Sequence, residues 1–128
     1  MEKEVRVLPD VVMVSEDMIE LSSPFMTSWG DVIRTGFYWN GMTANWAVGL
    51  PKFGDSVNIA SLEHDYIYVY EGVLPSGKVI PRIDADKMLR YNLLVDGNPM
   101  WKCELAYVFV RLFGGVLWKR KDSRAIGL

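Results

Sequence analysis

The spacing of apolar residues changes near residue 55, and this change constrains the fold more than any other feature. Before it, short aromatic and β-branched runs are separated by turn signals such as Pro9-Asp10, Gly30-Asp31 and Asn40-Gly41. Such a pattern is typical of strands and loops. After residue 55, apolar residues recur at helical spacing between capping residues and Gly or Pro. A β-rich first half followed by a helical second half predicts an α+β fold.

We expect residues 1–128 to form a single domain, because a chain of this length can bury most of its apolar surface in one core. Residues 1–54 are predicted to be β-rich and loop. Within them, residues 25–29 and 32–39 are expected to pair as a hairpin, and residues 41–54 to form an irregular loop.

Three helices are predicted in residues 55–115. Asp55 is expected to cap the first helix, Asn98-Pro99 to open the third, and Gly114-Gly115 to end it. The predicted ranges are 56–70, 83–95 and 99–113. Residues 116–128 are expected to form a short strand and a basic tail. The fold predicted is thus an N-terminal hairpin region packed on three helices, the first two of them antiparallel.

The third predicted helix is apolar almost all round. Its large apolar residues are Met100, Trp101, Leu105, Val108, Phe109 and Leu112. A helix of this kind is buried on several sides, so we expect it to pack either inside the domain or against a partner.

Charge and cysteine content exclude several classes of function. The net charge of −2 gives no general attraction to nucleic acid or anionic lipid. We interpret the basic run at residues 118–124 as a solvated tail, and contact with phosphates of nucleic acid or lipid is the alternative. A single cysteine, Cys103, cannot form an internal disulfide, and one Cys with one His cannot complete a zinc site.

No targeting or spanning segment is expected. The start, "MEKEVRVLPD", is charged and lacks the apolar centre of a signal peptide. No apolar run approaches 18 residues, so the protein is not expected to be transmembrane. Together with the unpaired cysteine, this favours an intracellular location or the interior of a virion.

The only histidine, His64, is the main candidate for chemistry. His64 and Tyr68 are four residues apart and share one helical face, whereas Asp65 points about 100° away. His64 could act as a general base on water, and Asp65 could bind calcium, which takes oxygen ligands. The simpler interpretation is a boundary pair with no catalytic role.

A carboxylate on the next helix would orient the histidine. Asp84 and Asp86 lie on opposite flanks of the apolar stripe of that helix, about equally far from its middle. Helical geometry therefore leaves both open, and either could instead simply favour the helix dipole.

Several separated blocks of sequence resemble a family of small, mostly uncharacterised bacteriophage proteins. The blocks are "HDYIY" at residues 64–68, Arg82 with the "AD" pair at 85–86, and "VFVRLFGG" at 108–115. The loop "GFYWNGMT" at 36–43 corresponds to a "GF…DGAS" loop of that family. The resemblance implies a bacteriophage protein.

The His-Asp-x-x-Tyr core is also similar to the active site of phospholipase A2. In that family the His activates water, the next Asp binds calcium, and the Tyr supports a second-helix Asp that orients the His. The resemblance implies His64 as the base and Asp65 as a calcium ligand. It implies Tyr68 as the support of Asp86, since the "AD" pair falls on Asp86. The loop Asp of the bacteriophage family corresponds to Asn40 here, and that resemblance implies a second, uncharged calcium ligand.

Three hypotheses follow. The first is a calcium-assisted ester hydrolase that acts on a host lipid or a cell-envelope ester. The chain lacks the Gly-rich, disulfide-braced calcium loop of phospholipases A2, and this favours the second hypothesis, a non-catalytic tail or neck component. Such a component would self-assemble or bind other particle proteins and retain the His-Asp-Tyr network as a scaffold. The third is an inhibitor of a host protein.

Overall fold

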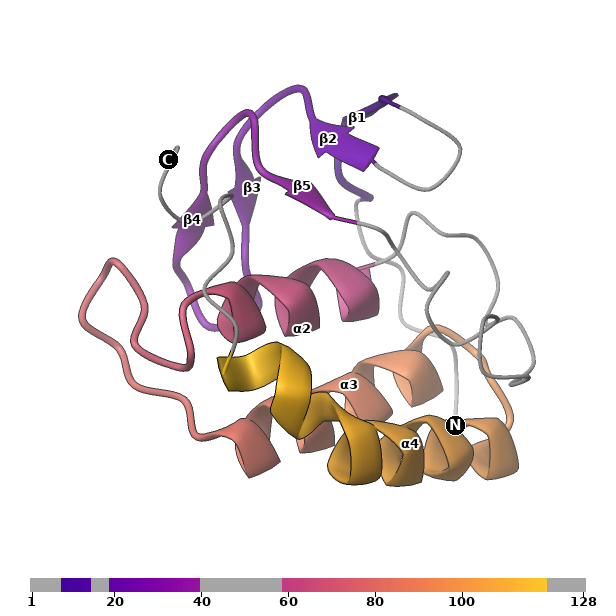
Figure 1. Cartoon of the computed structure of the whole chain (residues 1–128). Helices are drawn as coiled ribbons and strands as arrows, with labels where there is room; N and C mark the ends of the chain where they lie inside the picture. Colours follow the sequence, from indigo (N-terminus) through magenta and orange to yellow (C-terminus); the bar gives the residue numbers. More distant parts are fainter. Residues whose placement is uncertain (1–7, 15–18, 40–58, 120–128) are drawn as a thin grey trace.

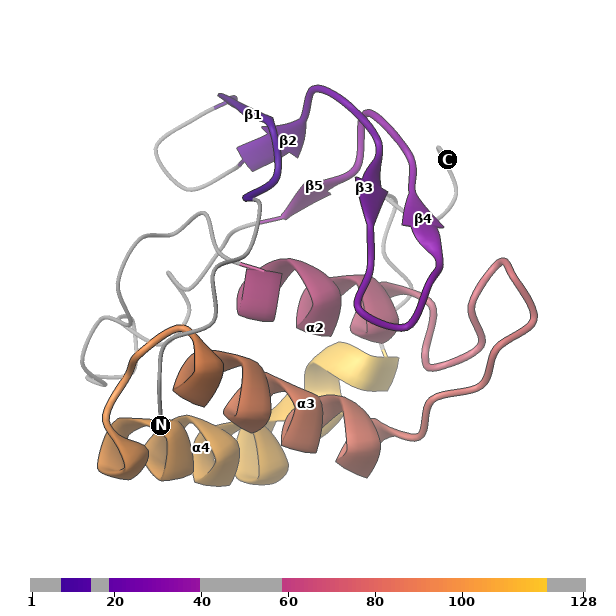
Figure 2. The ribbon, with the colours of Figure 1, turned by 180° about the vertical axis from the view of Figure 1, so that it is seen from behind.

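Five short strands and three helices make up residues 8–14, 19–39 and 59–119, the part of the chain described by this computed structural model. The strands lie on one side of a central helix, and the other two helices lie on its opposite side (Figure 1). The view from behind has the same order of layers (Figure 2). The predicted α+β fold, with a strand region packed on three helices, is confirmed.

The strands form two small antiparallel sheets. One sheet has the order β1-β2-β5, and the other pairs β3 with β4 so that Phe25 lies opposite Ile33. The bounds are β1 Val11–Met13, β2 Ile19–Leu21, β3 Phe25–Met26, β4 Val32–Ile33 and β5 Tyr38–Trp39.

The predicted hairpin is present only in its first part. β3 pairs with β4 as expected, but residues 38–39 pair with β2 instead of continuing the hairpin. The chain turns at Gly36, whose φ is +97° and whose N–H donates to the Leu21 carbonyl at 2.9 Å. Glycine adopts a positive φ without a steric penalty. This turn brings β5 to β2, a pairing that local alternation does not indicate.

The three helices are α2 (Ile59–Val69), α3 (Arg82–Val95) and α4 (Met100–Lys119). α2 and α3 are antiparallel, as predicted, and α4 runs back beside α3, on the side of α2 that faces away from the strands (Figures 1 and 2). Nine of the 11 residues of α2 are buried, which fits its place between the strands and the other helices. The predicted loop at 41–54, the Asp55 cap and the first residues of the predicted helix 56–70 lie outside the described residues.

The prediction that Gly114-Gly115 ends the third helix, with a strand at 116–119, is wrong. α4 continues through both glycines to Lys119. A Cβ atom on Gly114 would lie 2.6 Å from the hydroxyl oxygen of Tyr68, whereas a Cβ on Gly115 would lie 4.0 Å from its nearest neighbour. Gly114 therefore permits close contact between α4 and α2. The predicted basic tail lies in residues 120–128, outside the described ranges.

Two apolar cores flank α2. The first lies between α2 and the strands and contains Leu21, Ile33, Phe37, Trp39 and Ile67, among others. The second lies among the helices and contains Ala60, Leu89, Leu93, Cys103, Ala106 and Val110. Of the two alternatives for α4, burial on several sides within the domain does not hold, because Trp101, Val108 and Leu112 are exposed. Among its described side chains, full burial is confined to the face with Cys103 and Ala106.

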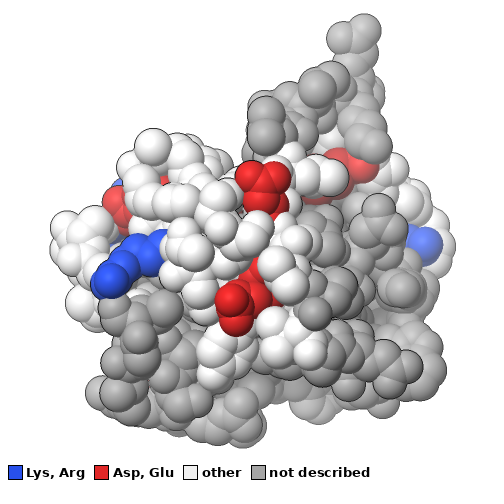
Figure 3. Space-filling model, turned by 90° about the horizontal axis from the view of Figure 1, so that it is seen from above, with Lys and Arg blue, Asp and Glu red and all other residues white. Residues whose placement is uncertain are grey.

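The surface on the strand side carries separated charges. Acidic and basic side chains are interspersed with uncharged ones on the described part of this face, without a broad patch of one sign (Figure 3). None of the helices in the described ranges is long and apolar enough to span a bilayer.

Gly114→Ala is expected to destabilise the protein, whereas Gly115→Ala is expected to be neutral or stabilising. Alanine favours a helix over glycine by up to about 1 kcal/mol. At Gly114, contact with the buried Tyr68 adds an overpacking cost of about 1–3 kcal/mol. Urea denaturation of the two variants measures the difference. An equal gain in both would contradict close α4–α2 contact at Gly114.

Candidate active site

α2 and α3 bring the three predicted catalytic residues into direct contact. Nε2 of His64 lies 2.8 Å from Oδ1 of Asp86. The Tyr68 hydroxyl donates to the same oxygen at 2.6 Å. The ring centroids of His64 and Tyr68 are 4.3 Å apart, as expected for residues one turn apart on a helical face.

The structure selects Asp86 over Asp84 as the partner of His64. Asp86 is 0% exposed and lies in the seam between helices, whereas Asp84 is exposed in the first turn of α3. Helical spacing alone places the two carboxylates symmetrically about the apolar stripe. The position of α4 breaks this symmetry, because α4 covers the flank of α3 that carries Asp86.

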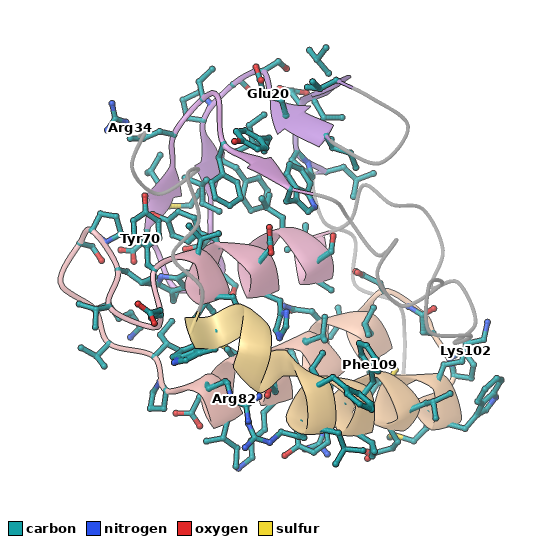
Figure 4. All side chains as sticks on the ribbon, viewed as in Figure 1. Glu20, Arg34, Tyr70, Arg82, Lys102 and Phe109 are labelled. Carbon is teal, nitrogen blue, oxygen red and sulfur yellow. The ribbon has the colours of Figure 1, made fainter. Side chains whose placement is uncertain are left out.

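Two arginines of the described residues also lie beside Asp86. Nη1 of Arg111 donates to Oδ2 of Asp86 at 2.8 Å, and Nη1 of Arg82 lies 3.7 Å from the same oxygen. Arg82 also donates to the Val110 carbonyl at 3.0 Å, so it links the start of α3 to α4 (Figure 4). Sequence reasoning assigned no role to Arg111, although a lone charge inside "VFVRLF" was the available signal.

These contacts keep Asp86 ionised. Burial alone would raise the pKa of Asp86, but hydrogen bonds from His64, Tyr68 and Arg111 outweigh it and hold the pKa below its ordinary value. Burial, followed by the hydrogen bond to Asp86 and its charge, raises the pKa of Tyr68 well above its usual range. At neutral pH the Tyr68 hydroxyl therefore keeps its proton and donates a hydrogen bond to an Asp86 carboxylate that stays ionised.

The bond to Asp86 determines which nitrogen of His64 is available. An ionised carboxylate only accepts hydrogen bonds, so in the neutral imidazole it is Nε2 that carries the proton and Nδ1 that has the lone pair. The His64 side chain is 14% exposed, whereas Asp86 is fully buried. The arrangement can therefore accept a proton at Nδ1 and stabilise the resulting imidazolium through Asp86.

Of the two predicted calcium ligands, Asp65 and Asn40, only Asp65 lies within the described residues. Asp65 lies on α2 and is partly buried, while Asn40 falls outside the described residues. Calcium takes six to eight oxygen ligands. No group of three or more His, Cys, Asp or Glu side chains in residues 8–14, 19–39 and 59–119 could hold a metal.

Glu63, next to His64, is a second buried carboxylate that sequence reasoning missed. It is 1% exposed and accepts hydrogen bonds from the Ser28 amide at 2.7 Å, the Ser28 hydroxyl at 2.9 Å and the Asn92 side chain at 3.1 Å. Its partners come from the β3–β4 turn and from α3. These contacts fix the rotation of α2 and therefore the direction in which His64 points.

No protein-family model, curated protein or solved structure matches this chain. The resemblances to bacteriophage proteins and to phospholipase A2 therefore depend on the motifs alone.

Proposed function

We propose that the protein hydrolyses an ester bond at a phospholipase A2-like site, with His64 as the base. The observation that carries this proposal is the 2.8 Å contact between His64 Nε2 and Asp86, which leaves Nδ1 available. Activation of water requires a base, a group that fixes the tautomer of the base, and residues that hold that group in place. Here the supports are Tyr68 and Arg111.

In this mechanism, His64 Nδ1 accepts a proton from water as the water oxygen attacks the ester carbonyl. The tetrahedral intermediate then collapses, the C–O bond to the leaving alcohol breaks, and His64 returns the proton to the alcohol oxygen. Asp86 stabilises the transient imidazolium. Arg111 and Tyr68 hold Asp86 in place, so they are positioning residues. No step of this scheme passes through calcium.

We further propose that the protein belongs to a bacteriophage and that its substrate is a host lipid or a cell-envelope ester. The three motif blocks support the first part, and the phospholipase-like arrangement of His64, Tyr68 and Asp86 supports the second. The site of action would be the virion or the host cytoplasm.

The test is an ester hydrolysis assay on phospholipid micelles and on soluble short-chain esters. Hydrolysis by the wild type that is lost in His64→Ala, with the thermal midpoint measured for both, would support the proposal. The absence of any turnover by the wild type, with and without calcium, would reject it.

The second candidate is a non-catalytic component of the phage particle, for instance of the tail or neck. Its supporting observation is the closed network around Asp86, which accepts three hydrogen bonds from two helices and thereby ties α2, α3 and α4 together. A fully satisfied buried network specifies packing without any chemistry. Calcium-independent assembly into large oligomers, without ester hydrolysis, would favour this candidate.

If calcium assists the reaction through Asp65, millimolar calcium is expected to raise the thermal midpoint of the wild type, because a ligand that binds only the native state stabilises it. The gain should reach about 2.7 kcal/mol at a concentration 100 times the dissociation constant. Asp65→Asn should abolish the gain. Magnesium is the control ion, and an equal shift with both ions, or in both proteins, would contradict a calcium site at Asp65.

A further inference from the structure

α4 carries an apolar stripe on the face opposite its buried side. The stripe consists of Trp101, Leu105, Val108 and Leu112, which are between 37% and 70% exposed. The buried face carries Cys103, Ala106 and Val110. At 100° per residue the two sets lie about 180° apart. We define the outer stripe as these four exposed residues.

The outer stripe has the spacing of a coiled-coil seam. Its members follow one another at intervals of four, three and four residues, which keeps them on one line when two helices wrap around each other. The stripe is also symmetric about its middle, since positions 101 and 112 are as far from the centre as each other, as are positions 105 and 108. The stripe can therefore pair with a second copy of itself, because a two-fold interface requires a surface that is complementary to itself.

We propose that the outer stripe is a homodimer interface in which α4 pairs with α4 of a second copy in antiparallel orientation. Trp101 then packs against Leu112 of the second copy, and Leu105 against Val108 of the second copy. Every large side chain of the stripe has an apolar partner in this register. The inference does not depend on the proposed hydrolytic activity.

Charges beside the stripe match the antiparallel orientation. In such a pair, the same flank of each helix faces its counterpart. Glu104 and Arg111 share one flank of the stripe, so the register places Glu104 of each copy beside Arg111 of the other. Glu104 is 49% exposed despite its 3.4 Å contact with Arg90, and Arg111 is 30% exposed despite its bond to Asp86. Both therefore retain surface for a further ion pair. In a parallel dimer opposite flanks face each other, so Glu104 of one copy would not meet Arg111 of the other.

The exposed apolar area of the stripe fits a weak dimer. Its four side chains are between 37% and 70% exposed. With up to roughly 250 Å² for a fully exposed large aromatic and less for an aliphatic side chain, pairing would bury on the order of 800 Å² of apolar surface in total. Interfaces of this size are typical of weak or transient association, and exposed apolar patches of several hundred Å² mark binding surfaces.

The first test is the oligomeric state of the full chain by sedimentation equilibrium over a range of about 1–500 µM. We expect a monomer–dimer equilibrium with a dissociation constant on the order of 10 µM. Leu112→Asp should weaken it at least tenfold, because it places a charge in the seam. Val79→Asp is the matched control, since Val79 is 64% exposed and lies between α2 and α3, away from the stripe. It should leave the constant unchanged.

A monomer at every concentration would overturn the proposal, and this result is expected if another segment of the chain or a different protein covers the stripe. A dimer that Leu112→Asp and Val79→Asp leave equally intact would overturn it as well. Circular dichroism of each variant confirms that the fold is retained, which the exposure of both positions favours.

The second test fixes the register. The double variant Trp101→Cys/Leu112→Cys should form a disulfide-linked dimer under mild oxidation, because the two positions meet between copies. Within one helix they lie about 16 Å apart, too far for a disulfide. Each single variant is the control and should remain largely uncrosslinked. Efficient crosslinking of a single variant would indicate parallel helices and overturn the antiparallel register.

Discussion

Replacing Asp86 with alanine is expected to lower the free energy of unfolding by about 3–5 kcal/mol, the range seen when one partner of a buried ion pair is removed. Asp86 is fully buried and accepts hydrogen bonds from His64, Tyr68 and Arg111. Without it, the Arg111 guanidinium loses its counterion, and the Tyr68 hydroxyl loses its acceptor. Urea denaturation at neutral pH measures the loss.

Asp84→Ala is the matched control for Asp86→Ala. Asp84 is two residues away on the same helix but is exposed in the first turn of α3, where its favourable interaction with the helix dipole is worth only about 0.3–1 kcal/mol. Equal losses of unfolding free energy in the two variants would contradict a stabilising role for the buried contacts of Asp86.

Acid should reduce the difference between the wild type and Asp86→Ala. The pKa of Asp86 is lower in the folded protein than in the unfolded chain. The stabilisation from its charge is therefore fully present above the unfolded-state pKa, and it is lost as the pH falls through the folded-state pKa. Measurements between neutral pH and about pH 2 cover this window. A difference that stays constant into acid would mean that the charge of Asp86 contributes little.

The sequence was sufficient to predict contact between His64, Tyr68 and a carboxylate of the next helix. Two residues four apart on a helix share a face wherever the helix packs, so the His64–Tyr68 pair follows from spacing alone. The choice between Asp84 and Asp86 does not follow from spacing. It depends on which flank of α3 is covered by α4, and this is a property of tertiary packing.

The residues that were missed depend on contacts far apart in the chain. Arg111 contacts Asp86 across 25 positions, and Glu63 contacts Ser28 across 35. A buried charge is recognisable only once its partner is in place. The prediction that Gly114 ends the helix is wrong for a related reason. Glycine can end a helix or permit close packing, and only the position of Tyr68 distinguishes the two roles.

Replacing His64 with alanine is expected to reduce ester turnover by about 10²–10⁴-fold, the usual contribution of a general base. This corresponds to about 3–5 kcal/mol in the activation free energy. The fold should be retained, because Tyr68 and Arg111 still bind Asp86 after the imidazole is removed. The measurement is kcat for the wild type and the variant on the same ester, with thermal midpoints recorded in parallel.

Added imidazole should restore part of the activity of His64→Ala, and this distinguishes a base from a packing residue. The variant leaves space for a ring beside Asp86, and the 14% exposure of the His64 side chain provides an approach from solvent. Imidazole in that space can donate to Asp86 and accept a proton from water, as His64 does. It should not rescue Asp86→Ala, which lacks the group that orients the ring. Unchanged turnover in His64→Ala would remove His64 from the mechanism, and the Asp86 network would then serve only to hold α2, α3 and α4 together.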